Sequence, residues 1–220
     1  DPWYKNYAFN KGWDLIYENE NMGEIALDNI THIWISHEHP DHFVPAFFNS
    51  LPNSLKKKIE VIFQKTVDGR VANFIRSKGI KVKEIAVNEL YTVGKTTIRI
   101  CPSEFYDSFM YISDGKHTIL NINDCPIRDE KSLKEIHDKL GDIDIILSQF
   151  SYAAWKGGKE NKKFRESSAR EKLSSFALQA KILKAKYIIP FASFVRFCHE
   201  ENYYLNDSIN TIEAVVERQD

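Results

Sequence analysis

The stretch Ile30-Thr31-His32-Ile33-Trp34-Ile35-Ser36-His37-Glu38-His39-Pro40-Asp41-His42 decides the fold of this chain. Residues 30–36 are rich in β-branched and apolar types, which predicts a buried strand. Residues 37–42 then carry three imidazoles and two carboxylates. A buried strand that runs directly into so many ionisable side chains favours a metal site over a solvated turn.

The spacing inside this motif indicates ligands for two metal ions. In an extended segment, residues two apart share a side, so His37 and His39 can chelate one ion. Asp41 and His42 lie just beyond the turn and can reach a second ion. Imidazole combined with carboxylate suits zinc, iron or manganese. The histidines that we interpret as structural or solvated are His32, His117 and His137.

The H-x-H-x-D-H pattern after an apolar strand resembles the metallo-β-lactamase superfamily. Two later segments continue the resemblance. Residues 118–125 look like the superfamily strand that ends in a metal-bridging aspartate, here Asp124. Residues 186–192, followed by His199, look like the late strand and the final histidine ligand. The resemblance implies an α/β fold, the αββα sandwich, without its N-terminal strands in this sequence and with residues 1–220 as one domain.

One branch of the superfamily, the CMP-N-acetylneuraminate hydroxylase-like proteins, is similar in further details. Its opening is similar to residues 1–3 and 8–13, and it has an Asp-Cys pair like Asp124-Cys125. That branch carries a Rieske cluster, which needs paired C-x-H and C-x-x-H motifs that these 220 residues lack. Either the cluster lies before Asp1, or an external reductase supplies electrons, or the protein is not a hydroxylase.

Superfamily hydrolases usually place a third histidine for the first metal between the motif and the bridging aspartate, yet no histidine lies between His42 and His117. The corresponding segment is residues 100–109, and the register puts Ser103 or Glu104 near the missing ligand. Glutamate is the better metal ligand of the two. The resemblance adds that iron-using oxygenases of the superfamily carry a glutamate at this position. An added carboxylate favours iron or manganese over zinc. We therefore expect Glu104 to be a ligand.

The resemblance thus implies a centre of two divalent ions bridged by Asp124. The first ion would be held by His37, His39 and Glu104, and the second by Asp41, His42 and His199. Asp41 and Asp124 would also be the catalytic residues.

Two neighbouring cations lower the pKa of a shared water molecule and polarise substrate oxygens. With zinc such a centre gives hydrolysis, whereas two ferrous ions with a source of electrons give dioxygen binding and hydroxylation. We favour a non-haem diiron oxygenase that hydroxylates a small polar or nucleotide-linked substrate, with Zn or Mn as alternative metals. The alternative functions are a zinc-dependent hydrolase of a phosphodiester, lactone or other ester, and an inert binding protein whose first metal site is empty.

Hydrophobic periodicity predicts strands and helices in mixed order. Strands are expected at residues 30–36, 58–64, 81–87, 91–93, 96–101, 108–113, 118–123, 143–148 and 186–190. Helices are expected at residues 43–51, 67–78, 131–140, 167–184 and 208–217.

Composition limits the remaining classes of function. The net charge of -1 gives no sign of a nucleic-acid partner, and no apolar run is long enough for a membrane span. The three cysteines lack C-x-x-C spacing, which argues against a disulfide framework and for a reducing, cytoplasmic location. We expect a small-molecule substrate and, for an oxygenase, an external electron donor. The sequence leaves the oligomeric state open.

A basic loop is expected at residues 155–165. It holds five basic residues, one acid and two aromatics. It could be a lid that supplies cations to a phosphate or carboxylate, with an aromatic for stacking. Because charge runs are common in loops, a solvated loop is the interpretation that we favour slightly.

Overall fold

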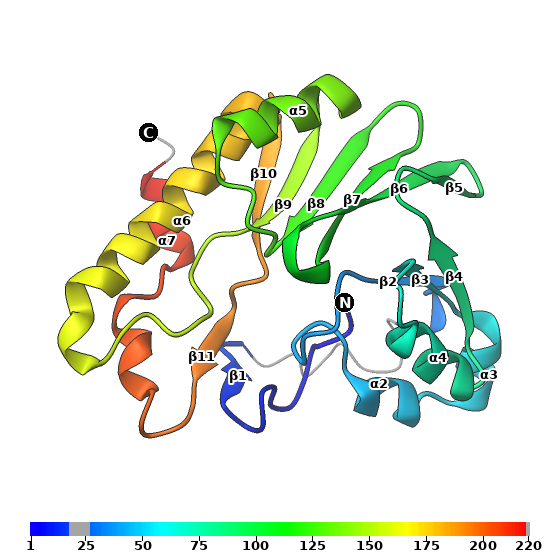
Figure 1. Ribbon diagram of the computed structural model, residues 1–220, viewed down its shortest axis with the longest axis horizontal. Coiled ribbons are helices and arrows are strands. Elements are labelled where there is room, and N and C mark those ends of the chain that lie inside the picture. The colour runs from blue at the N-terminus through cyan, green and yellow to red at the C-terminus, as the bar shows by residue number, and fades with distance from the viewer. Residues whose placement is uncertain (18–26, 219–220) are drawn as a thin grey trace.

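The computed structural model of the protein describes residues 1–17 and 27–218. Two β-sheets lie face to face, and helices cover the outer side of each sheet (Figure 1). This arrangement confirms the α/β sandwich that the sequence predicts.

The smaller sheet carries the histidine-rich motif at the end of its first strand. Its parallel strands are β2 (His32–Ile35), β3 (Glu60–Gln64) and β4 (Lys81–Ile85), in that order. Its covering helices are α2 (Pro45–Ser50), α3 (Asn53–Lys58) and α4 (Arg70–Ser77). Ile33 and Ile35 are two residues apart, so both side chains point toward the helices, where they pack with Phe48 and Ile75.

The larger sheet has the strand order β10-β9-β8-β7-β6-β5. Its strands are β5 (Leu90–Val93), β6 (Thr96–Pro102), β7 (Ser108–Ser113), β8 (Thr118–Asn123), β9 (Ile145–Gln149) and β10 (Tyr187–Phe191). β5 to β8 pair antiparallel, whereas β8, β9 and β10 are parallel. The two parallel connections contain α5 (Glu130–Leu140) and α6 (Lys162–Ile182). These helices cover the outer face, where Leu133 and Leu183 pack on Leu120 and Ile146.

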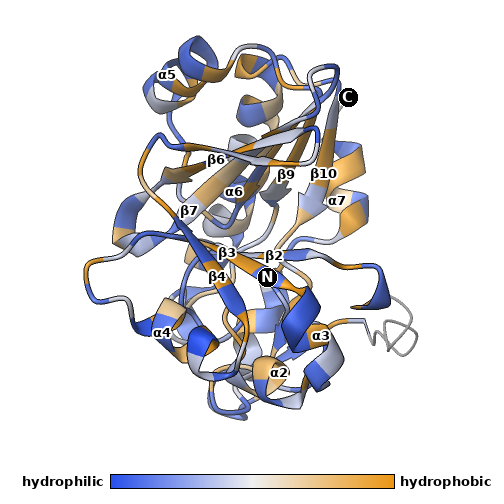
Figure 2. Cartoon of the chain, turned by 90° about the vertical axis from the view of Figure 1, so that its right-hand side faces the viewer, coloured by the Kyte–Doolittle hydropathy of each residue, from blue (hydrophilic) through white to orange (hydrophobic). Residues whose placement is uncertain are grey.

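The core between the sheets comes from the opposite faces of the same strands. Trp34 and Ile62 of the smaller sheet meet Ile98, Ile100 and Met110 of the larger one. Figure 2 shows this division, with apolar colour along the strands and a mainly hydrophilic α5 at the outer side. These strands therefore bury both faces, one under the helices and one between the sheets, which explains their near-continuous apolar sequences.

A third, two-stranded sheet closes one end of the sandwich. β1 (Trp13–Leu15) pairs antiparallel with β11 (Val195–Phe197). The short helix η3 (Tyr203–Ser208) and α7 (Ile212–Glu217) follow. Trp13 packs edge-on against Phe197, with ring centroids 5.8 Å apart. This sheet brings the first fifteen residues beside the C-terminal part of the chain, which the sequence alone did not predict.

Among the helices of the described residues, none combines the length and apolar composition that crossing a bilayer requires.

Candidate metal centre

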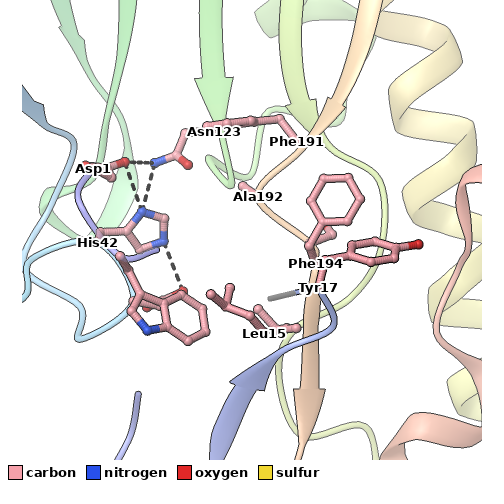
Figure 3. A pocket seen from close by; sticks show the side chains of 12 residues that line it. Asp1, Leu15, Tyr17, His42, Asn123, Phe191, Ala192 and Phe194 are labelled. Atoms are coloured by element: carbon pink, nitrogen blue, oxygen red, sulfur yellow. Dashed lines mark hydrogen bonds and ion pairs between the residues drawn. The ribbon is translucent and has the colours of Figure 1, made fainter. Parts of the chain in front are cut away.

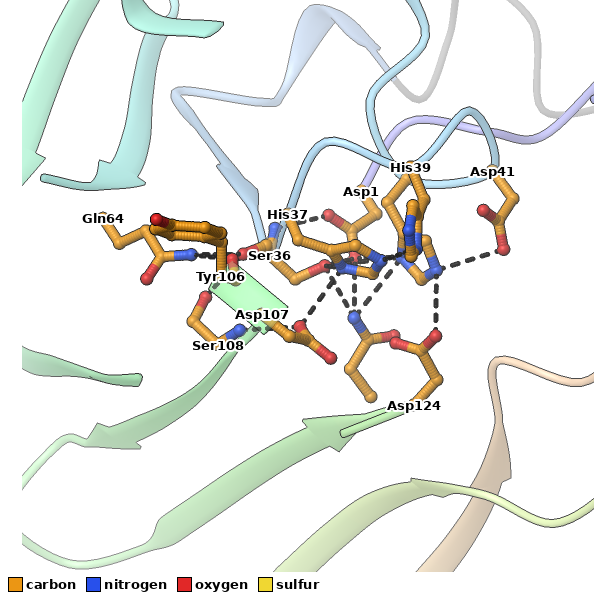
Figure 4. Close-up of polar contacts among 12 residues, drawn as sticks. Asp1, Ser36, His37, His39, Asp41, Gln64, Tyr106, Asp107, Ser108 and Asp124 are labelled. Carbon is orange, nitrogen blue, oxygen red and sulfur yellow. Dashed lines mark hydrogen bonds and ion pairs between the residues drawn. The ribbon is translucent and has the colours of Figure 1, made fainter. Parts of the chain in front are cut away.

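The C-terminal ends of β2 and β8 meet at one edge of the sandwich (Figure 4). Ser36 follows β2, and Asn123 is the last residue of β8. Asn123 Nδ2 donates to Ser36 Oγ at 2.6 Å. Asn123 has a φ of 60°, a left-handed conformation that asparagine tolerates better than most residues. This turn and this hydrogen bond place Asp124 opposite the histidine-rich motif.

Three of the predicted ligands converge in the structure. His37, His42 and Asp124 each offer one ligand atom, and these atoms all lie within 4.8 Å of one another. Both histidines are buried, with 3% and 5% of their surfaces exposed. Asp41 joins the group through His42, because its Oδ2 lies 3.1 Å from His42 Nε2. Nitrogen and oxygen donors gathered at this distance suit a divalent transition metal.

His39 lies beside His37 as the spacing predicts. The Nδ1 atom of His39 is 2.8 Å from Nε2 of His37. The two rings are nearly perpendicular, at 81°. At this distance one nitrogen donates a proton to the other. A first ion bound by this pair would replace that proton and lie beside both nitrogens.

Two carboxylates hold the buried histidines from behind. Asp107 Oδ1 lies 3.2 Å from Nδ1 of His37, and Asp1 Oδ2 lies 3.1 Å from Nδ1 of His42. A carboxylate only accepts, so each Nδ1 carries a proton, and Nε2 is the ring nitrogen left to face the centre. Such carboxylate–histidine pairs commonly orient metal ligands. Asp1 is itself fixed by the backbone N–H of Ser36, at 2.8 Å.

The structure does not bring Glu104 to this cluster, which corrects the sequence-based expectation for the missing third ligand. Glu104 is exposed and lines a separate surface cavity with Cys101 and Lys139. It begins a single 3-10 turn, Glu104–Tyr106, and Phe105 and Tyr106 there have φ values of 56° and 61°. These left-handed residues turn the chain so that the next carboxylate, Asp107, points inward. Sequence register alone cannot reveal such a turn.

The charges of the cluster stabilise one another. Burial lowers the pKa of His42, but the hydrogen bonds and negative charges of Asp124 and Asp41 outweigh burial and raise it to about 9. Burial raises the pKa of Asp124, yet its hydrogen bond to His42 and the charges of His42 and His37 bring it well below the usual range. Without a metal, His42 is therefore a cation between Asp41 and Asp124. A metal ion bound at His42 Nε2 would take the place of the proton there.

Two buried carboxylate oxygens without hydrogen-bond partners show whether these residues fit a metal ion. Asp41 Oδ1 and Asp124 Oδ1 are buried and have no hydrogen-bond partner among the described residues. A buried carboxylate oxygen without a partner is costly, and a cation would satisfy both. The residues therefore fit a divalent ion between the motif and Asp124.

His199 lies at the rim, outside the three-residue cluster. It follows β11, and its Cε1 would be 3.8 Å from a Cβ atom built on Gly12. Gly12 and Phe9 belong to one turn, in which the N–H of Gly12 donates to the carbonyl of Phe9. Phe9 contacts His39 with ring centroids 6.3 Å apart, so this turn lies beside the centre. The structure places His199 beside Gly12, and its role as a ligand stays a prediction.

A cavity of about 330 Å³ opens beside His42 and Asp41 (Figure 3). Its wall is mostly apolar and comes from the N-terminal segment and the connection between β10 and β11. The apolar lining residues are Trp3, Leu15, Phe191, Ala192, Phe194 and Val195. An apolar cavity with a few polar groups at one end is the usual form of a small-molecule site.

The segment expected as a basic loop ends in helix, because α6 begins at Lys162, and its end is anchored. Arg165, only 1% exposed, makes two hydrogen bonds to the carboxylate of Asp207, at 2.8 and 2.7 Å. It also donates to the carbonyl oxygens of Gly158 and Lys159. One of the five basic residues is therefore structural, while Trp155 remains 69% exposed.

Comparisons with known proteins identify distant relatives of the chain. No family model matches the chain. The cytidine monophosphate-N-acetylneuraminic acid hydroxylase of Danio rerio is 23% identical over 239 aligned positions, which cover 94% of this chain and 37% of that protein. The chain spans about a third of the length of the curated relatives it matches.

Solved structures define the class of fold. The diiron β-hydroxylase CmlA of Streptomyces venezuelae matches with a TM-score of 0.59 and 15% identity, over 92% of this chain and 43% of that one. YhfI of Bacillus subtilis, a metallo-β-lactamase fold protein, gives 0.55 and 16%, over 78% and 67%. The metallo hydrolase Igni18 of Ignicoccus hospitalis gives 0.51 and 12%, over 79% and 69%. The chain has the metallo-β-lactamase fold, which both hydroxylases and hydrolases use.

Proposed function

We propose that this chain forms the metal-bearing part of a dinuclear enzyme. In this proposal the enzyme uses iron and dioxygen to hydroxylate a small polar or nucleotide-linked substrate. The observation that carries the proposal is the carboxylate content of the centre. Asp41 and Asp124 face it directly, and Asp107 stands behind His37. Carboxylate-rich sites favour iron or manganese over zinc.

The proposed ligands follow from the nitrogen and oxygen atoms that face the centre. For the first ion they are His37 Nε2 and His39 Nδ1. For the second ion they are Asp41 and His42 Nε2. The sequence resemblance adds His199 to this second set. Asp124 would contact both ions. Asp107 would orient His37, and Glu104 would have no role at the centre.

When bound, the ions would supply Lewis acidity and, in the ferrous state with an electron donor, oxygen activation. The chain's own residues have simpler tasks. Asp107 and Asp1 keep the imidazoles of His37 and His42 in the tautomer that leaves Nε2 free. The apolar wall beside His42 would exclude water from the reacting part of the substrate.

A zinc-dependent hydrolase of a phosphodiester, lactone or other ester is the alternative. The observation that favours it is the donor set itself, since zinc also accepts the imidazole nitrogens of His37 and His42 and the carboxylate oxygen of Asp124. The similarity to a metallo hydrolase of the same fold supports it further.

Metal analysis after anaerobic purification separates the two functions. An oxygenase should contain about two iron ions per chain and change its visible absorption on exposure to oxygen. A hydrolase should contain zinc and cleave bis(p-nitrophenyl) phosphate or a simple lactone. The matched controls are His42→Ala, which should lose metal, and His117→Ala, whose side chain is 71% exposed and should lose none.

A further inference from the structure

The cavity beside His42 has an apolar wall that two distant segments of the chain build together (Figure 3). Leu15 of β1 and Val195 of β11 are paired in register, and both line the cavity. Phe194, which precedes β11, has its ring centroid 5.9 Å from that of Tyr17, and both rings also belong to the lining. The β1–β11 sheet therefore fixes this wall.

The cavity is large enough for a ring. Its volume of about 330 Å³ is roughly twice the ~150 Å³ of an engineered apolar cavity that binds benzene. Burying a ring here would remove apolar surface from water on both the ring and the wall, which is favourable.

The charges around the cavity favour an uncharged occupant. The described residues that line it include no lysine or arginine. Its charged groups are Asp1, Asp41 and His42, which the metal centre already uses. Because this lining sets two carboxylates against one imidazole, it offers no net attraction to a carboxylate or phosphate group.

One polar atom of the lining lacks a partner. Asn123 is 1% exposed, and its Nδ2 lies 2.6 Å from Ser36 Oγ and 3.3 Å from Asp1 Oδ2. Because a carboxylate only accepts, the amide nitrogen must be on the side of Asp1. Asn123 Oδ1 has no hydrogen-bond partner among the described residues, and Figure 3 shows it turned toward the cavity. The hydroxyl of Ser193, by contrast, is already used by the backbone of residues 150 and 151.

We propose that this cavity binds a neutral, ring-sized apolar group of the substrate, and that Asn123 Oδ1 accepts a hydrogen bond from an N–H or O–H donor on that group. The inference rests on the proposed function in so far as it makes the occupant part of a substrate. Asp41 and His42 line the same cavity, so the bound group would lie beside the metal centre. A polar or nucleotide part of the substrate would stay outside.

Three ligands with one benzene ring each test the proposal: toluene, phenol and benzoate. The protein is titrated as purified and again after a chelator has removed any metal, because the second series excludes coordination of a ligand to a metal ion. Ligand-observed NMR measures the binding.

We expect metal-free protein to bind phenol at least as tightly as toluene, because the hydroxyl that replaces the methyl group finds an acceptor. Without an acceptor, burial of the hydroxyl would weaken the binding of phenol about tenfold relative to toluene. Benzoate should bind at least about tenfold more weakly than phenol, because its charge would be buried without a cationic partner in excess.

Variants of one wall residue place the ligands in this cavity. Leu15→Trp puts a larger side chain into the space and should weaken binding of phenol and toluene at least about tenfold. Leu15→Met keeps the volume and should retain binding. The control is Leu90→Trp, the same change at a leucine of β5 that is 55% exposed. Circular dichroism melting shows whether each variant is folded.

Each part of the proposal can fail by itself. No binding of either neutral ligand to wild-type protein, or equal binding by wild type and folded Leu15→Trp, would overturn the cavity as the site. Phenol binding tenfold weaker than toluene would overturn the role of Asn123, and benzoate binding as tight as phenol would overturn the neutral class of ligand. If Leu15→Trp does not fold, the three ligands on wild-type protein still decide. If the protein contains no metal, the proposed function fails, but these titrations still show what the cavity binds.

Discussion

Asp107 Oδ1 lies 3.2 Å from Nδ1 of His37, and this contact defines how the first half of the centre is built. The carboxylate takes the proton-bearing side of the ring, so Nε2 points toward Nδ1 of His39. Asp1 and His42 repeat the arrangement on the other side. The two buried imidazoles are therefore oriented alike by two aspartates that are far apart in the sequence.

This contact predicts different effects for the two acidic residues of the connection between β6 and β7. Asp107→Asn should weaken metal binding about 10- to 100-fold, the usual effect of removing a carboxylate that orients a histidine ligand. Glu104→Gln should leave metal affinity within about twofold, because its side chain is exposed and away from the cluster. Competition with a chromophoric chelator measures both affinities. A larger loss of metal affinity in Glu104→Gln than in Asp107→Asn would show that Glu104 is a ligand and contradict the arrangement described here.

The pair on the other side gives a second prediction. Asp1→Asn keeps an acceptor near Nδ1 of His42 but removes the negative charge. We expect binding of the second ion to weaken about tenfold, with the first ion retained. The matched control is Asp14→Asn, since Asp14 pairs with Arg196 on the β1–β11 sheet. Equal losses in both variants would mean that the effect is not specific to His42.

His199 lies outside the cluster of His37, His42 and Asp124, so a variant at this position tests its proposed role as a ligand. His199→Ala should remove one metal equivalent and the activity that depends on it. Metal content by emission spectroscopy and turnover are compared with His117→Ala, an exposed histidine. Full metal content and full activity in the His199 variant would remove this residue from the centre.

The anchor of the basic loop makes a prediction about stability and pH. The hydrogen bonds from Arg165 bring the pKa of Asp207 down from 3.8 to about 2 against the opposing effect of burial. A carboxyl group with a depressed folded-state pKa stabilises the fold above its unfolded pKa and loses this contribution as the pH falls toward the folded value. Asp207→Asn should therefore lower Tm by about 2–5 °C at neutral pH.

The difference in Tm between wild type and Asp207→Asn should begin to narrow only below pH 3.8 and continue to narrow toward about 2. Scanning calorimetry over this range provides the comparison, with Asp138→Asn on the exposed face of α5 as control. A constant difference down to the lowest accessible pH would show that the pair does not act through ionisation.

Much of the fold follows from local sequence signals. The run before the motif forms β2, and the segments expected at 108–113 and 118–123 form β7 and β8 with those bounds. These elements were predictable because alternation and apolar runs are strong where both faces of a strand are buried. Three-residue strands such as β1 and β11 carry no usable period, so their pairing could not be seen.

The parts of the site that escaped prediction depend on backbone turns and long-range pairing. Asp107 faces inward because Phe105 and Tyr106 adopt left-handed conformations, which their residue types do not announce. Asp1 reaches His42 only through the folded arrangement of strands. By contrast, the motif His37–His42 was readable, because adjacency in sequence after a buried strand guarantees adjacency in space.

The central claim is that His37, His39, Asp41, His42 and Asp124 enclose two metal ions, and anomalous diffraction tests it most directly. Crystals of protein reconstituted anaerobically with ferrous iron are measured above and below the iron absorption edge. The account predicts one anomalous peak within bonding distance of His37 Nε2 and His39 Nδ1, and a second within bonding distance of His42 Nε2, with Asp124 next to both. Iron that is absent from these atoms, or bound elsewhere on the chain, would contradict it.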